Sequence, residues 1–388
     1  MQHGLSEEHQ AIRDGVKKIV DQFDDAYWTK RDEEQSFPFE FHRAMADGGW
    51  LGITMPPELG GAGLGVTEAA IMMHTVTSGC GGYSAASTLH LNLFGPHAVV
   101  VFGTDEQKKR MLPGLIKGTD QACFGVTEPD AGLDTTSIST FAKKVPGGYR
   151  VTGRKIWTST AQVANKILLL TRTTPKDQCK KPTDGITLFY TDLDKTKIEV
   201  RKIPKMGRNA VDSNATFIDD YFIPEEDRIG EEGKGFRCIL HSLNPERILV
   251  AVESIGFGQA ALRRAATYAQ ERVVFGRPIG KNQGIAHPLA ESWIELESAY
   301  WMAMRAAYLY DADLPCGAEA NAAKFAGGKA CFNACTRAVL THGGMGYAKE
   351  YQVERFWRDS ILPVITPVSP EMILNFIAEK VLELPKSY

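Results

Sequence analysis

The chain has 388 residues, of which 43% are hydrophobic and 23% are charged, and its net charge is −3. It is long enough to bury a large core in about two or three domains, and its scattered Lys and Arg residues exclude a basic surface for nucleic acid. It has no run of 18 apolar residues, and its N-terminus is charged from the start. We therefore expect no stable membrane insertion, no secretory signal and a cytoplasmic location.

The spacing of apolar residues predicts helices from Ser6 to about Gln121, as in "HQAIRDGVKKIVDQF" and "DEQKKRMLPGLIKG". Short β-branched and aromatic runs, such as "GYRVTGRKIWTS" and "GITLFYTDL", then predict an antiparallel all-β module. Helical spacing returns after "GEEGKGF". The sequence therefore predicts an α+β protein with an N-terminal all-α domain at 1–121, a middle β domain at 122–232 and a C-terminal helical domain at 233–388.

Several helices of the last third carry small residues on more than one face, so we expect further copies of the chain to cover them. The seven cysteines are dispersed and include no CxxC pair, which fits reduced thiols. Cys331 and Cys335 stand one helical turn apart in "FAGGKACFNACTRAVL". In such a helix cysteine serves as a small hydrophobe, and we expect no metal site.

The segment "CFGVTEPDAGLDTTS", which begins at Cys123, opens the β module and gathers several polar residues in a short span. Pro129 and Gly132 mark a turn, and its backbone N–H groups and hydroxyls could hold phosphates or ring carbonyls of a ligand. A plain surface loop explains the same residues. The segment alone does not decide between these two interpretations.

The order of the elements and six motifs resemble the acyl-CoA dehydrogenase family over essentially the whole chain. The resemblance implies a β-barrel or sandwich between two helical domains, the last a four-helix bundle, with FAD bound between the β domain and the C-terminal helices. It also implies a homotetramer, built as a pair of dimers, that desaturates an acyl-CoA thioester and passes electrons to an electron-transfer flavoprotein. The motifs are "GWLGITMPPELGGAGLG", "FGVTEPDAGLD", "GRKIWTST", "KMGRNAVDSNATFIDDYFIPEEDRIGEEGKGF", "ERVVFGRPIGKNQG" and "THGGMGYAKEYQVERFWRDS".

Two of these motifs fall where the family surrounds the flavin ring. A flavin that accepts hydride must be stacked, dry and hydrogen-bonded, so that the developing charge is stabilised. Trp157 could instead have a purely structural role, because an aromatic residue in a strand is often part of the core. The resemblance places Phe124, Val126 and Thr127 on one side of the ring, and Trp157, Thr158 and Ser159 on the other.

Two further motifs match those that reach the adenosine diphosphate part of FAD across a dimer interface. Arg272, Phe275 and Gln283 supply a guanidinium for the pyrophosphate, an aromatic face for adenine and an amide for its edge. Gly343 and Gly344 match the glycine pair that lets the backbone approach the diphosphate. A pair of glycines alone is usually only a turn.

The chain departs from the family at two polar positions. A Ser that commonly bonds the pyrophosphate is Leu133 here, and a Gln that commonly precedes the glycine pair is Leu340. FAD would then be held by fewer polar contacts, or by substitutes such as Ser369.

The base that removes the α-proton of the thioester is the largest departure. In many members this carboxylate follows the "RD" pair, at the position that is Pro367 here. Members resembling isovaleryl- and long-chain acyl-CoA dehydrogenases place it on another helix, immediately before an Arg. Glu246 and Arg247 match that arrangement. The resemblance therefore implies Glu246 as the catalytic base, with Arg247 and Asn244 contacting the substrate, although an acid after Asn244 is by itself typical of a helix start.

Glu371 is the rival base, because it lies four residues after Pro367. Against it, Ser369 as an N-cap and Pro370 at the first helical position would make Glu371 a helix-start acid. Pro367 also lacks the N–H that the family uses to polarise the thioester carbonyl. Donation by Val368, the ribityl hydroxyl of FAD acting nearly alone, and a shifted substrate remain open at this point.

Two other reactions or roles fit the same motifs. An acyl-CoA oxidase or flavin monooxygenase would use the same fold, and a non-catalytic protein that binds flavin or CoA would explain the missing Glu and N–H. The spacing of the motifs does not determine the acyl chain. The helix location of Glu246 favours a branched or medium-to-long chain only weakly.

Overall fold

The structure is a computed structural model that describes residues 5–94 and 96–386. Helices form the N-terminal region, and two of them begin as their sequences indicate. The Ser6 hydroxyl accepts from the backbone N–H of His9, and Thr104 and Gln107 form a capping box. The helices of this region are α1 (Glu7–Val20), α2 (Asp25–Glu34), α3 (Phe39–Asp47), α4 (Val66–Thr77), α5 (Gly82–Phe94), α6 (His97–Phe102) and α7 (Asp105–Ile116).

The sheet follows with the strand order β6-β7-β3-β2-β4-β5-β8, and β1 pairs with β4. Most neighbours are antiparallel, as predicted, but the sheet is mixed because β1 and β2 both lie parallel to β4. The strands are β1 (Ala122–Gly125), β2 (Phe141–Val145), β3 (Gly148–Ser159), β4 (Lys166–Arg172), β5 (Ile186–Asp192), β6 (Ile198–Lys202), β7 (Ser213–Pro224) and β8 (Arg228–Ile229).

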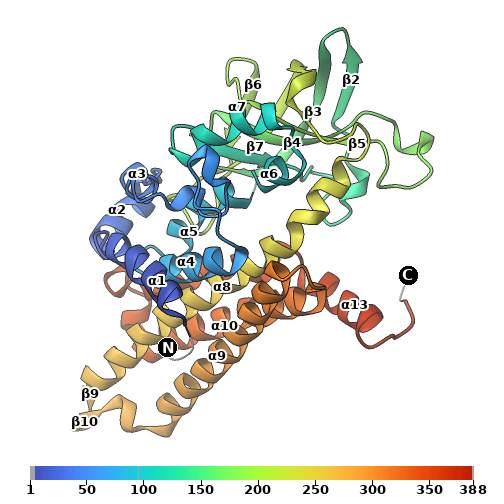
Figure 1. Ribbon diagram of the computed structural model, residues 1–388. Coiled ribbons are helices and arrows are strands. Elements are labelled where there is room, and N and C mark those ends of the chain that lie inside the picture. The colour runs from blue at the N-terminus through green and yellow to red at the C-terminus, as the bar shows by residue number, and fades with distance from the viewer. Residues whose placement is uncertain (1–4, 95, 387–388) are drawn as a thin grey trace.

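Long helices form the C-terminal region, so the predicted order of helices, sheet and helices is confirmed. Helix α8 runs from the sheet to the β9–β10 hairpin at the opposite end of the molecule (Figure 1). The elements are α8 (Gly235–Glu271), β9 (Val273–Val274), β10 (Arg277–Pro278), α9 (Gln283–Asp311), α10 (Gly317–His342), α11 (Val353–Ser360), α12 (Leu362–Ile365) and α13 (Pro370–Lys380).

Helix α8 lies at the centre of the helix packing, because small residues on it let several helices approach closely. A Cβ added at Gly258 would lie 2.7 Å from Leu296 of α9 and 3.0 Å from the Cα atom of Cys331 of α10. At Gly256 it would lie 2.4 Å from the carbonyl oxygen of His74 in α4. The same interface buries Cys331, as expected of a packing cysteine. Glycine therefore sets how closely α4, α9 and α10 pack around α8.

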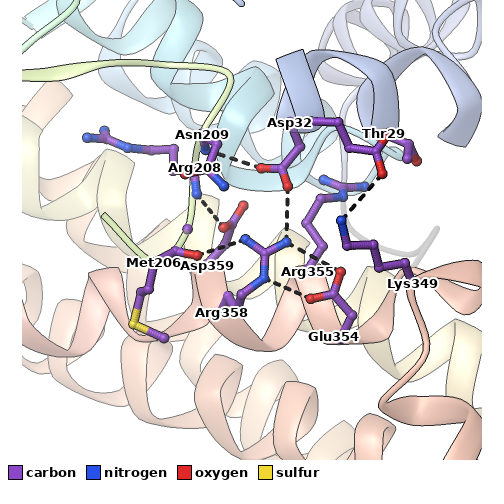
Figure 2. Close-up of polar contacts among 12 residues, drawn as sticks. Thr29, Asp32, Met206, Arg208, Asn209, Lys349, Glu354, Arg355, Arg358 and Asp359 are labelled. Carbon is purple, nitrogen blue, oxygen red and sulfur yellow. Dashed lines mark hydrogen bonds and ion pairs between the residues drawn. The ribbon is translucent and has the colours of Figure 1, made fainter. Parts of the chain in front are cut away.

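A polar cluster joins the three regions of the chain (Figure 2). Arg358 of α11 donates to Asp32 of α2 at 3.0 Å and to the carbonyl oxygen of Met206 at 2.8 Å. Asp359 accepts from the backbone N–H of Arg208 at 2.5 Å. These bonds fix the loop between β6 and β7 against the helices, at the place where the candidate site lies.

Within the described residues, one helical segment, Gly82–Phe102, is long and apolar enough to cross a membrane, and the bent pair Val353–Ile365 and Pro370–Lys380 would be a second. Neither candidate was expected from the sequence. Inside the molecule 69% of the apolar window of Gly82–Phe102 is buried. This segment therefore has the burial of a core helix.

Candidate active site

A buried histidine lies between two carboxylates where α5 crosses α8. The Nε2 atom of His90 lies 2.7 Å from a carboxylate oxygen of Glu246, and its Nδ1 atom lies 2.7 Å from one of Glu253. The two acids are two helical turns apart, so both project from one face of α8. Burial opposes a charge on His90, but Glu246 and Glu253 raise its pKa well above the usual value. Glu246, with only 7% of its surface exposed, thus has the His90 ring as a buried side-chain partner.

Helix α5 carries this group of residues to the sheet. The side-chain oxygen of Asn92 accepts from the backbone N–H of Ala122 at 3.0 Å, which places α5 against β1. The guanidinium of Arg208 donates to the hydroxyls of Ser87 in α5 and Ser159 in β3, at 3.1 and 3.0 Å. The Glu246 helix, α5 and the end of β3 therefore meet at one place.

The two predicted flavin motifs lie side by side at this end of the sheet. The carbonyl oxygen of Thr127 accepts from the backbone N–H of Ile156 at 2.9 Å. Phe124 and Val126 precede Thr127 and are half-buried. The structure therefore brings together the residues that the sequence analysis assigned to the two sides of one ring.

Trp157 sits at a bulge of β3 and is turned out of the core. Its φ is +62°, the pairing of β3 with β7 shifts between Lys155 and Thr158, and 55% of Trp157 is exposed. The core-aromatic interpretation of Trp157 is therefore wrong. Thr158 beside it is buried, and its hydroxyl has no hydrogen-bond partner, which leaves a donor and an acceptor for a polar ligand.

A buried ion pair fixes the turn that follows Thr127. The Nζ atom of Lys155 lies 2.8 Å from a carboxylate oxygen of Glu128, which also accepts from the backbone N–H groups of Ser139 and Thr140. Burial favours the neutral acid, but the charge and hydrogen bond of Lys155 outweigh it and lower the pKa of Glu128 to about 2. Glu128 thus holds the turn rather than acting as a base.

The predicted substrate residues lie next to the candidate base on α8. Arg247 donates from Nη1 to the side-chain oxygen of Asn244 at 3.1 Å. Its Nε atom is buried and has no hydrogen-bond partner, so an acceptor on a bound molecule would satisfy it. Pro245 between them lies inside the helix and has no N–H to donate.

The rival acid and its loop are arranged differently. Helix α13 begins at Pro370, and the Ser369 hydroxyl accepts from the backbone N–H of Met372 at 3.4 Å, as predicted for an N-cap. Glu371 is exposed in the first turn. Lys324 of α10 is buried and donates to the carbonyl oxygen of Val368 at 2.6 Å, which ties this loop to the bundle.

Comparison with known proteins agrees with this arrangement. The sequence models of the N-terminal, middle and C-terminal domains of acyl-CoA dehydrogenase match residues 6–119, 123–221 and 233–382. The chain belongs to the acyl-CoA dehydrogenase family. It is 34% identical to acyl-CoA dehydrogenase FadE12 of Mycobacterium tuberculosis, over 99% of this chain and 98% of that protein.

Two further relatives bear on the site. The chain is 35% identical to the caffeyl-CoA reductase-Etf complex subunit CarC of Acetobacterium woodii, over 84% of this chain and 86% of that protein. Its fold superimposes on butyryl-CoA dehydrogenase from Megasphaera elsdenii with a TM-score of 0.92 and 28% identity, over 98% of this chain and all of that one. The chain is therefore an oxidoreductase of the acyl-CoA dehydrogenase type, and its cofactor is FAD.

The residues present fit this cofactor. The unpartnered hydroxyl of Thr158 and the outward Trp157 suit a flat ring with polar edges. Gly343 ends α10 with φ +59°, and neither it nor Gly344 would bring an added Cβ within 4 Å of another atom. The backbone at these two glycines is therefore open to a diphosphate.

The predicted adenosine diphosphate residues lie far from the flavin motifs within one chain. Helix α8 has 37 residues, which corresponds to about 55 Å of helix. Glu246 lies in its first third, whereas Arg272 follows its last residue. Phe275 in the adjoining hairpin is 100% exposed, and Gln283 is also exposed. A single chain does not bring these two sets of residues together.

Sequence reasoning missed His90, Glu253 and Arg208. The signal was present for the first two, because His90 interrupts the apolar run "AASTLHLNLF" and Glu253 interrupts "ILVAVESIGFG". A polar residue inside an apolar helix needs a buried partner. Nothing in the sequence indicated that these two residues are partners of each other.

Proposed function

We propose that this enzyme removes hydrogen across the Cα–Cβ bond of an acyl-CoA thioester, with Glu246 as the base that takes the α-proton. When bound, FAD supplies the acceptor for the hydride that leaves the β-carbon. The observation that carries the proposal is the position of Glu246, which is buried on α8 where α5 and the Trp157–Ser159 strand end converge. Glu371, the alternative acid, is exposed at a helix start.

The same residues support roles in binding the thioester. Arg247 has a buried Nε donor free for the substrate, and Asn244 holds its guanidinium in place. In this proposal the backbone N–H of Val368, one residue beyond Pro367, donates a hydrogen bond to the thioester carbonyl. Lys324 supports this peptide through its 2.6 Å bond to the Val368 carbonyl oxygen. Val368 would thereby replace the donor that proline lacks.

The active unit in this proposal contains more than one copy of the chain. Arg272, Phe275, Gln283, Gly343 and Gly344 would hold the adenosine diphosphate of FAD that is bound mainly by a second copy, in a homotetramer. The exposed apolar face of α9 supports such an assembly, because a monomer rarely exposes several large side chains together. More than half of each of Trp293, Ile294 and Trp301 is exposed.

We further propose an electron-transfer flavoprotein as the electron acceptor. The relative CarC is by name part of a reductase-Etf complex. The fold also matches, with a TM-score of 0.93 and 27% identity, a structure described with the electron transferring flavoprotein of Acidaminococcus fermentans. The test is an assay in air without an added electron acceptor. Rapid formation of peroxide there would indicate an oxidase and would exclude the electron-transfer flavoprotein as the required acceptor.

The test is anaerobic titration of the purified yellow protein with acyl-CoAs of varied length and branching. The wild type should lose flavin absorbance with at least one of them. Glu246→Gln should keep FAD but lose this bleaching, whereas Glu371→Gln, the matched control, should bleach normally. Loss of bleaching in the Glu371 variant alone would transfer the role to Glu371. A flavin that stays oxidised with every acyl-CoA would favour a non-catalytic binding protein.

A further inference from the structure

The buried group of Glu246, His90 and Glu253 carries an inference about how the base is controlled, which rests on the proposed role of Glu246. We propose that His90 is a positioning residue for the reaction: an imidazolium, held by Glu253, that keeps the Glu246 carboxylate ionised and oriented. Each ring nitrogen of His90 lies 2.7 Å from one carboxylate oxygen. This geometry requires N–H on both nitrogens if both acids are ionised.

Burial disfavours the ionised form of a carboxylate, and a cationic His90 would oppose this effect at Glu246. Burial alone favours the neutral acid, and a neutral Glu246 could not take a proton. A cation at 2.7 Å offsets this, because an opposite charge within a few ångström favours the charged form. In this arrangement the Glu246 carboxylate has a buried partner and needs no contact with bulk water.

Glu253 has a separate part in this arrangement. It contacts the far nitrogen of the ring, so it does not compete with Glu246 for the same N–H. With a single acid, the proton of His90 would be held less firmly, since burial opposes its charge. The second carboxylate therefore fixes both the charge and the plane of the ring, as the orienting acid does in other histidine-containing sites.

Other charged groups near the cluster do not replace His90. Arg208, from the loop between β6 and β7, acts on Glu253 by its charge, but the hydrogen bonds of its guanidinium go to serine hydroxyls. Arg247 lies beside Glu246 on α8 and bonds Asn244. The other titratable and charged groups that act on the cluster are Tyr83 of α5, Arg208 and Arg247.

The experiment compares three single variants in the FAD-loaded enzyme. His90→Gln keeps a hydrogen-bonding side chain of similar length but removes the charge. Glu253→Gln removes the second carboxylate and leaves Glu246 and His90 in place. His74→Gln is the matched control, because His74 is also in a buried helix and its Nε2 atom lies 2.9 Å from an amide oxygen, that of Gln259, and not from a carboxylate. Burial lowers the pKa of His74 to about 4, so it is neutral at pH 7.

The first readout is the rate of flavin reduction by acyl-CoA as a function of pH. Removal of the cation should move the rise of this rate with pH to higher pH, because a nearby opposite charge favours the ionised form of a carboxylate. We expect a shift of roughly one to three pH units in His90→Gln, a smaller shift in the same direction in Glu253→Gln, and none in His74→Gln. A His90→Gln profile that superimposes on the wild type overturns the proposal.

The second readout is independent of catalysis and of whether His90→Gln folds. Nitrogen-15 NMR of the imidazole rings in the wild-type holoenzyme should show one ring, absent from His90→Gln or altered in Glu253→Gln, that is doubly protonated at pH 7. A neutral His90 at this pH overturns the proposal. If Glu246→Gln still bleaches the flavin while His90 is cationic, the proposed role of Glu246 fails instead, so the two failures are distinguishable.

Discussion

Substitution of Lys155 by Met should destabilise the protein far more than substitution of its neighbour Arg154. Lys155 and Glu128 are both buried, with 2.8 Å between Nζ and the carboxylate oxygen. The low pKa of Glu128, about 2 against an ordinary 4.5, corresponds to at most about 3 kcal/mol in favour of the folded state at neutral pH. Burial lowers the pKa of Lys155 to about 8 despite Glu128. The free-energy cost of burying the ammonium therefore offsets most of the stabilisation from Glu128.

The intact pair therefore contributes little to the free energy of unfolding, whereas one buried member without its partner would lower that free energy. Lys155→Met leaves the Glu128 carboxylate buried without a cation, which costs about 3–5 kcal/mol in comparable pairs. Glu128→Gln in the same chain should recover part of the loss. Arg154→Met is the control, because Arg154 and Asp130 form an exposed pair at 2.8 Å, and such pairs contribute about 0–1 kcal/mol.

Urea unfolding followed by tryptophan fluorescence measures these differences at pH 7. The pH dependence gives a second check on Glu128. Its folded pKa lies below its unfolded pKa, so its stabilisation is present above about pH 4.5 and is lost as pH falls toward 2. In Lys155→Met the unpaired carboxylate is relieved by protonation, so the deficit in unfolding free energy relative to the wild type should shrink as pH falls. A Lys155→Met protein within about 1 kcal/mol of the wild type would refute this reasoning.

Three further substitutions test the cofactor site and the core. Trp157→Ala should weaken retention of FAD during gel filtration with little change in urea midpoint, because Trp157 is 55% exposed; equal FAD content would remove it from the site. Phe275→Ala should lower FAD content or the assembled mass in light scattering, although its fully exposed side chain contributes nothing to the fold of one chain. Gly258→Ala should destabilise by about 1–3 kcal/mol, because the new Cβ would lie 2.7 Å from Leu296; an unchanged melting temperature would contradict that packing.

The sequence predicted the features that depend on local periodicity and on local rules. The order of helices, sheet and helices follows from the spacing of apolar residues, and the start of α13 follows from Ser369 and Pro370. The parallel pairing of β1 with β4 did not follow, because a strand of four residues carries no direction in its composition. The position of Trp157 did not follow either, since a bulge changes which face a strand residue takes.

The chemistry of the site shows the same division. Glu246 could be singled out only through the family resemblance, because "NPER" is typical of a helix start; that interpretation is wrong, since α8 begins at Gly235 and Pro245 lies inside it. Its pairing with His90 joins residues that are 156 positions apart, and no local pattern records which helices cross. The two sets of predicted FAD residues lie toward opposite ends of α8, a separation that depends on the length of that helix.

The most direct test of the account is exchange of the α-hydrogens of a bound acyl-CoA with deuterium oxide, followed by mass spectrometry. This exchange needs only the base and a polarised carbonyl, so it reports proton removal apart from hydride transfer. If Glu246 is the base, exchange should occur in the wild type and in Glu371→Gln, and should be absent from Glu246→Gln that has kept its FAD. Undiminished exchange in Glu246→Gln would contradict it.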